Sequence, residues 1–142
     1  MLKDIAKKYY HNGYNCAEAM LYAGNEYYQL DLSPQTYKLM AGFGGGANIE
    51  DICGVVSGSI ALLGIIFVEK RASESKEIKE ITQDFINRFK EEMGTINCKE
   101  LKGLYREEKE KCSPIVEKGA VILENIIEKY RIKYPYVIIQ TP

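Results

Sequence analysis

The sequence predicts an all-α fold, a single compact domain of about six or seven helices. Three observations predict it. Apolar residues recur every three or four positions through most of the chain. Ser33-Pro34 and Ser113-Pro114 have the capping residue and the proline that favour a helix start. The length of 142 residues suits one domain with one core.

The first half of the chain is expected to hold three helices. Leu2, Ile5, Ala6 and Tyr9 predict a helix over residues 2–11, which Gly13 ends. A second helix is expected from about Cys16 to Tyr28. A short third helix begins at Ser33-Pro34 and ends near Ala41.

A glycine-rich stretch, GFGGGANIEDICGVVSGS at residues 42–59, leads into the most apolar helix, Cys53 to about Phe67, which is expected to be the central helix of the fold. Gly44, Gly45 and Gly46 favour a sharp turn. The segment lacks the G-K-[ST] ending of a phosphate-binding loop, so a nucleotide site is not predicted. A backbone anion site near Cys53 and a tight packing loop remain the alternatives. Gly54 and Gly58 each cost the helix about 1 kcal/mol, so a neighbouring backbone is expected to pack closely there.

The second half of the chain is expected to hold three more helices. A long helix carries an apolar stripe from Ile78 to Phe89 and stops at Gly94. A short one runs from Asn97 through Leu104, and the last begins at Cys112-Ser113-Pro114. Residues 1–134 are interpreted as the domain and 135–142 as an apolar, β-like tail. The tail can pack on the core or on a second subunit, which leaves a homo-oligomer as one expectation.

The charge of the chain argues against nucleic acid as a partner. The formal net charge is −1, and the basic cluster from Lys99 to Lys111 is interrupted by glutamates, as on a solvated helix face. The N-terminus lacks the apolar core of a signal peptide. The longest apolar run, Ser59 to Val68, is far shorter than the roughly 18 residues of a membrane span. No membrane span and a cytoplasmic location are therefore expected.

Four cysteines share one local context, the start of a predicted helix. Cys16 follows Asn15 and Cys98 follows Asn97, both good N-caps. Cys53 follows the acidic pair Glu50-Asp51, which suits a helix entry, and Cys112 precedes Ser113. Unpaired N–H groups and the positive end of the helix dipole stabilise a thiolate, so lowered thiol pKa values are expected.

The spacing of the cysteines constrains their chemistry. The chain contains no C-x-x-C and no closely spaced ligand pair of the kind found in zinc or iron–sulfur motifs. Thiol–disulfide exchange needs only two thiols that the fold brings together. We therefore expect a thiol redox protein. Two alternatives stay open: a zinc or iron–sulfur module with Cys16, Cys53, Cys98 and Cys112 as ligands, and a structural or adaptor protein whose cysteines fill the core.

The order of several motifs resembles that of the C-GCAxxG-C-C proteins. These motifs are GYNCAEAML, GFGGG, CGVVSGSIALLG, GTINC and CSPIV, and they extend over nearly the whole chain. The family is described as redox-active on the basis of four shared cysteines. By the resemblance, Cys16, Cys53, Cys98 and Cys112 are those cysteines, and Gly54 and Gly58 are the glycines of its CGAxxG element. Val55 stands where the family usually has alanine.

These observations predict roles for the thiols. Cys53 is expected to attack first, because the glycine-rich loop leaves room for a partner, and Cys112 or Cys16 is expected to resolve the mixed disulfide. The partner is expected to be a redox protein, a small thiol or another electron carrier. His11 lies near Cys16, but no orienting residue accompanies it, so a surface or capping role is preferred to catalysis.

Overall fold

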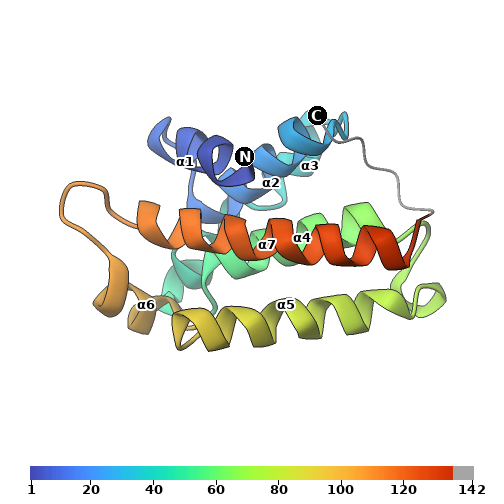
Figure 1. Ribbon diagram of the computed structural model, residues 1–142. Coiled ribbons are helices and arrows are strands. Elements are labelled where there is room, and N and C mark those ends of the chain that lie inside the picture. The colour runs from blue at the N-terminus through green and yellow to red at the C-terminus, as the bar shows by residue number, and fades with distance from the viewer. Residues whose placement is uncertain (136–142) are drawn as a thin grey trace.

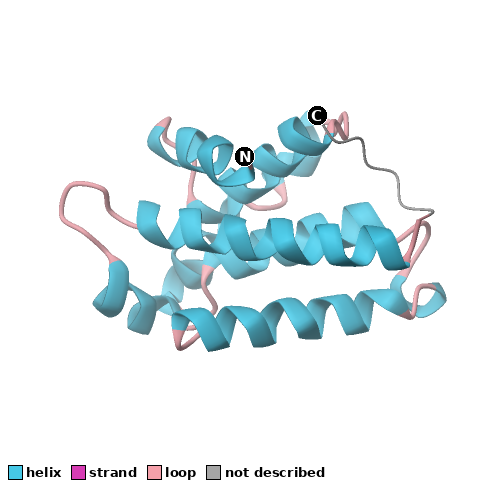
Figure 2. Cartoon of the chain, viewed as in Figure 1, coloured by secondary structure: helices cyan, strands magenta, loops and turns pink. Residues whose placement is uncertain are grey.

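The computed structural model describes residues 1–135, and within them it contains seven α-helices and no β-strand (Figures 1 and 2). The prediction of an all-α fold is confirmed. The expected tail lies at residues 136–142, outside the described residues. The helices are α1 (Leu2–His11), α2 (Cys16–Tyr28), α3 (Pro34–Lys38), α4 (Gly54–Phe67), α5 (Glu77–Met93), α6 (Cys98–Tyr105) and α7 (Ser113–Lys133).

The helix boundaries follow local signals closely. Asn15 and Asn97 cap α2 and α6, and each side chain accepts a backbone N–H three residues on. Gly94 ends α5 in the left-handed conformation, as expected from its missing Cβ. The helix at Ser33-Pro34 is shorter than predicted, since α3 ends at Lys38 and a separate 3-10 turn covers Ala41–Phe43.

The central position expected for the most apolar helix is confirmed. α4 packs against α2, α5 and α7, and in Figure 1 it lies behind α7. Nine of its residues are buried, which is what a helix without a charged side chain requires. Gly58 allows the close approach to α2, because a Cβ there would lie 2.5 Å from the carbonyl oxygen of Ala17. The close backbone packing predicted at Gly58 is thus present.

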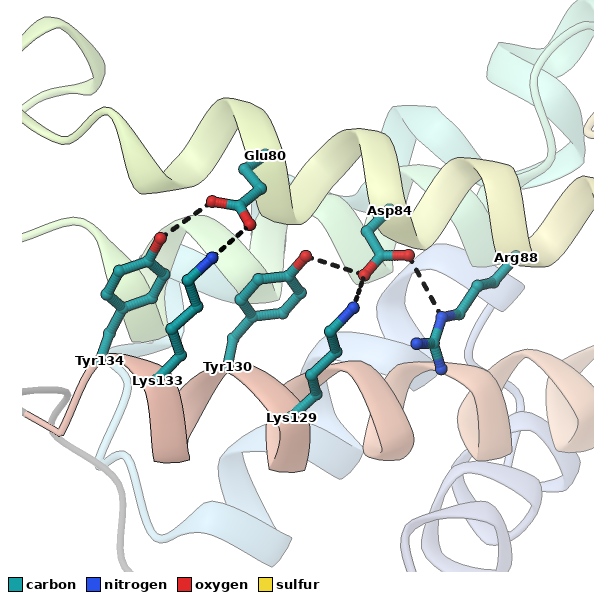
Figure 3. A network of polar contacts seen from close by, with 7 residues as sticks. All are labelled: Glu80, Asp84, Arg88, Lys129, Tyr130, Lys133 and Tyr134. Atoms are coloured by element: carbon teal, nitrogen blue, oxygen red, sulfur yellow. Dashed lines mark hydrogen bonds and ion pairs between the residues drawn. The ribbon is translucent and has the colours of Figure 1, made fainter.

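Polar contacts join the first half of α5 to the C-terminal end of α7, and the two helices run antiparallel (Figures 1 and 3). Asp84 accepts hydrogen bonds from Lys129 at 2.7 Å and Tyr130 at 2.8 Å. One turn earlier on α5, Glu80 accepts from Lys133 at 2.7 Å and Tyr134 at 2.9 Å. This spacing of four residues on both helices fixes how α5 and α7 lie along one another.

None of the helices within residues 1–135 combines the length and the apolar character that a bilayer crossing requires.

Candidate functional site

The glycine-rich loop forms a left-handed turn immediately before α4. Gly45, Gly46, Ala47 and Asn48 have φ values of 63°, 63°, 60° and 62°. Consecutive residues in this conformation are rare, because an L side chain there costs roughly 1–2 kcal/mol per residue. The turn closes with a hydrogen bond of 2.9 Å from the Asp51 N–H to the Gly46 carbonyl.

This turn corrects the expected start of the helix. Glu50 also has a positive φ, of 57°, and Asp51 is exposed in the loop, so the acidic pair does not begin α4. Cys53 is instead the N-cap residue, and α4 begins at Gly54. The chain needs the intervening residues to leave the left-handed turn before it can enter a right-handed helix.

A short antiparallel bridge between Ile52 and Asn97 joins the starts of α4 and α6. The Cys53 N–H donates to the Ile96 carbonyl at 2.8 Å, and the Cys98 N–H donates to the Asp51 carbonyl at 2.6 Å. Because side chains alternate across such a bridge, Cys53 and Cys98 occupy diagonal positions on the same side of it.

Cys16 reaches the same region from the start of α2. The side chain of Asn15 accepts the Glu18 N–H at 2.8 Å, and Glu18 accepts the Asn15 N–H at 3.0 Å, a complete capping box. The Cys16 sulfur lies so close to Gly54 that a Cβ at Gly54 would overlap it. The missing side chain at Gly54 thus lets Cys16 of α2 come close to the start of α4.

Cys112 is held at the start of α7 by two contacts from α1. Its N–H donates to the hydroxyl oxygen of Tyr10 at 3.0 Å. Next to Tyr10 on α1, His11 has its Nε2 3.0 Å from a carboxylate oxygen of Glu110, two residues before Cys112. Residues of α1 thus fix the segment that carries Cys112.

All four cysteines line one cavity of about 700 Å³. They come from the starts of four helices that are far apart in the sequence: α2, α4, α6 and α7. A volume of this size is typical of small-molecule sites. Its other lining residues are Tyr10, His11, Gly13, Tyr14, Asn15, Glu18, Gly45, Val55, Leu101, Lys102, Arg106, Glu110, Lys111 and Ile115.

The four thiols differ in exposure. Cys53 and Cys98 are buried, with exposed fractions of 4% and 6%, whereas Cys16 and Cys112 are half-buried. The expectation that the glycine-rich loop leaves Cys53 open to a partner is wrong. Its side chain is buried at the N-cap of α4 instead.

Burial also reverses the predicted effect of the helix starts on thiol acidity. Burial raises the pKa of Cys53 to about 12, although the N–H groups of Val55 and Val56 act in the opposite direction. Burial likewise raises the thiol pKa values of Cys16 and Cys98. The lowered pKa values expected for these three thiols are therefore wrong, because loss of water around the sulfur outweighs the helix end.

All four thiols are free, and within residues 1–135 no two of them lie at disulfide distance. The described residues also bring no three His, Cys, Asp or Glu side chains into a group that could hold a metal ion. The zinc or iron–sulfur site considered from the sequence has no preformed ligand set there. The cysteines share a cavity without being joined.

Sequence reasoning missed several residues of this cavity. Residues 106–111 were expected to continue a solvated helix face, but α6 ends at Tyr105 and Arg106 and Lys111 line the cavity from a loop. The position of Lys111 next to Cys112 was a usable signal. Tyr10 gave none, because its contact with Cys112 joins residues 102 positions apart.

Comparison with known families matches residues 14–126 to the family described as "Putative redox-active protein (C_GCAxxG_C_C)". No curated protein and no solved structure matches the chain. The matched segment includes all four cysteines of the cavity. The chain therefore belongs to the C_GCAxxG_C_C family.

Proposed function

We propose that this protein exchanges thiols for disulfides at the four-cysteine cavity. The observation that carries the proposal is the convergence of Cys16, Cys53, Cys98 and Cys112 on one cavity from four separate helix starts. Cysteines that only filled the core would not need to converge on one cavity. The family's description as redox-active supports the same chemistry.

Cys112 is the preferred attacking thiol. It is half-buried rather than buried, it stands at the start of a long helix, and its backbone N–H is held by the Tyr10 hydroxyl. This replaces the earlier assignment of attack to Cys53, whose burial keeps it protonated and out of reach.

The exchange takes two steps. The Cys112 thiolate attacks one sulfur of a disulfide R–S–S–R, the S–S bond breaks, and RS⁻ leaves with the electron pair and takes up a proton. The Cys16 thiolate then attacks the Cys112 sulfur and releases the second RS⁻. Two protein thiols are oxidised to one disulfide, and R–S–S–R is reduced to two RSH. Cys16 is the preferred resolving thiol because it is half-buried and lines the same cavity as Cys112.

The test is a redox titration with thiol mapping. The protein is equilibrated with thiol–disulfide couples between about −320 and −180 mV, alkylated, and analysed by peptide mass spectrometry. We expect two thiols to be lost together and a Cys16–Cys112 link to appear. Cys112→Ser should abolish the link, whereas Cys98→Ala, the matched control, should keep it. Four reduced thiols at about −180 mV would contradict the proposal.

A further inference from the structure

The charged side chains that line the cavity differ in whether they have a polar partner in the protein. Three cations line it, Lys102, Arg106 and Lys111, together with two carboxylates, Glu18 and Glu110. Charged side chains that line a cavity favour a small ligand of the opposite charge. Their electrostatic effect is stronger there, because the low dielectric of the cavity wall screens a charge less than bulk water does.

Both carboxylates already have partners. Glu110 pairs with His11 at 3.0 Å, and Glu18 accepts the Asn15 N–H at 3.0 Å in the capping box. Both carboxylates therefore already interact with residues of the protein, His11 and Asn15.

Two of the three cations have no such partner. Lys102 pairs with Glu50 at 3.5 Å, but within residues 1–135 neither Arg106 nor Lys111 forms an ion pair through its side chain. The two lie at opposite ends of the loop between α6 and α7, and an antiparallel bridge between Glu107 and Lys111 closes this loop. The loop therefore presents two unneutralised cations beside Cys112.

We propose that the cavity selects a low-molecular-weight disulfide that carries carboxylate groups, with Arg106 and Lys111 holding a carboxylate while Cys112 attacks the adjacent S–S bond. The inference rests on the proposed function and names its substrate class. Arg106 binds a carboxylate with two parallel hydrogen bonds, and Lys111 adds a second charge. The cavity of about 700 Å³ has the size of a small-molecule site.

The first step is mixed-disulfide formation. The Cys112 thiolate and ⁻OOC–R–S–S–R–COO⁻ give Cys112–S–S–R–COO⁻ and the thiolate ⁻OOC–R–S⁻, which takes a proton from water. The Cys112 sulfur is oxidised and the departing sulfur is reduced. Arg106 and Lys111 are positioning residues in this step, because they contact the carboxylate and not the reacting sulfurs.

Three disulfides of similar size and different charge test the proposal: 3,3′-dithiodipropionate (anionic), 2-hydroxyethyl disulfide (neutral) and cystamine (cationic). The rate constant for modification of Cys112 is measured for each by intact-protein and peptide mass spectrometry. The readout is the ratio of the anionic to the neutral rate constant, because any change in the intrinsic reactivity of Cys112 cancels in it.

In the wild-type protein, the rate constant should be highest for the anionic disulfide, lower for the neutral one and lowest for the cationic one. Arg106→Gln with Lys111→Gln should lower the anionic-to-neutral ratio by about tenfold, and added salt should lower the wild-type ratio towards that of the variant. Lys109→Gln is the matched control, since Lys109 is an exposed cation of the same loop that does not line the cavity. It should leave the ratio unchanged.

The outcomes separate the two proposals. A ratio that the double variant does not change, or a preference for cystamine, overturns the inference and leaves the proposed function standing. Reduction of a protein disulfide without reaction at the small ones also overturns it and points to a protein substrate. Failure to react with any disulfide overturns both.

Discussion

The thiol of Cys53 shows two physical effects in competition at a single residue. The N–H groups of Val55 and Val56 at the start of α4 favour the thiolate, whereas burial favours the neutral thiol. Burial prevails and raises the pKa from 9.0 to about 12. At neutral pH this side chain is therefore an uncharged thiol beside the sulfur of Cys16.

The raised pKa of Cys53 predicts a loss of stability at alkaline pH. Above about pH 9 the thiol ionises in the unfolded chain but stays protonated in the folded chain, so stability is present below pH 9 and falls until about pH 12. The Cys53→Ala variant should lose about 1–2 kcal/mol less than the wild type between pH 9 and about 10.5. Urea unfolding at several pH values measures this. Parallel pH profiles of the two proteins would contradict it.

The left-handed turn predicts opposite effects at two adjacent residues. Ala47 is exposed with φ at 60°, so Ala47→Gly should stabilise the protein by about 0.5–1 kcal/mol. Gly46→Ala should destabilise it by more than that, because the new Cβ would lie 2.7 Å from the Cys98 Cβ and would also overlap the Asp51 backbone. Urea midpoints compare the two. Equal shifts of the same sign would contradict the left-handed turn.

The pairing of α5 with α7 is decided at the level of whole elements. Asp84 is the more protected of the two α5 carboxylates that pair with lysines of α7, and its partner Tyr130 is 2% exposed (Figure 3). Burial alone would raise the pKa of the Asp84 carboxyl, but the hydrogen bonds from Lys129 and Tyr130 outweigh it and lower the pKa. Glu80 makes similar contacts in an exposed setting.

Asp84→Ala should therefore cost more stability than Glu80→Ala. The first change leaves the Tyr130 hydroxyl without this acceptor and should cost about 1–3 kcal/mol. The second removes only exposed contacts, which solvent screens, and should cost clearly less. Because the Asp84 pKa is lowered, its contribution is present above pH 3.8 and is lost as the pH falls through the lower pKa of the folded state. Thermal melts at pH 7 test the order, and a larger loss for Glu80→Ala would contradict it.

At the scale of the whole molecule, the cavity depends on how closely α2 and α4 pack. Gly58 meets the backbone of Ala17, the residue after Cys16, and Gly54 meets the Cys16 sulfur. One helix–helix contact thus sets both the core and the position of Cys16 beside Cys53.

Gly58→Ala should separate α2 from α4 and disturb the cavity. The added Cβ would lie 2.5 Å from the Ala17 oxygen, so we expect a loss of about 1–3 kcal/mol and faster alkylation of Cys53 by iodoacetamide. Gly64→Ala is the matched control. Gly64 lies in the same helix with nothing within 4 Å of the added Cβ, so alanine there should stabilise by up to about 1 kcal/mol. Similar effects of both changes would show that close packing at Gly58 is unimportant.

The helix boundaries could be predicted because the residues that set them act over short distances along the chain. The capping residues Asn15 and Asn97 bond to backbone three positions away, and Gly94 acts through its own φ. Such effects extend over a single turn, so the sequence carries them in full. The predicted third helix, which ends near Ala41, is longer than α3, because no local residue marks Lys38 as the end of the helix.

The site was predictable in its members but not in its environment. The sequence alone determined the four cysteines as one set, their places at helix starts, and the need for glycine at positions 54 and 58. Only the tertiary structure decided which thiols are buried, which direction their pKa values shift, and that Tyr10, Arg106 and Lys111 join them. The physical reason is distance along the chain: a helix start is made by neighbours within one turn, whereas burial and charge at a sulfur are set by residues of other helices.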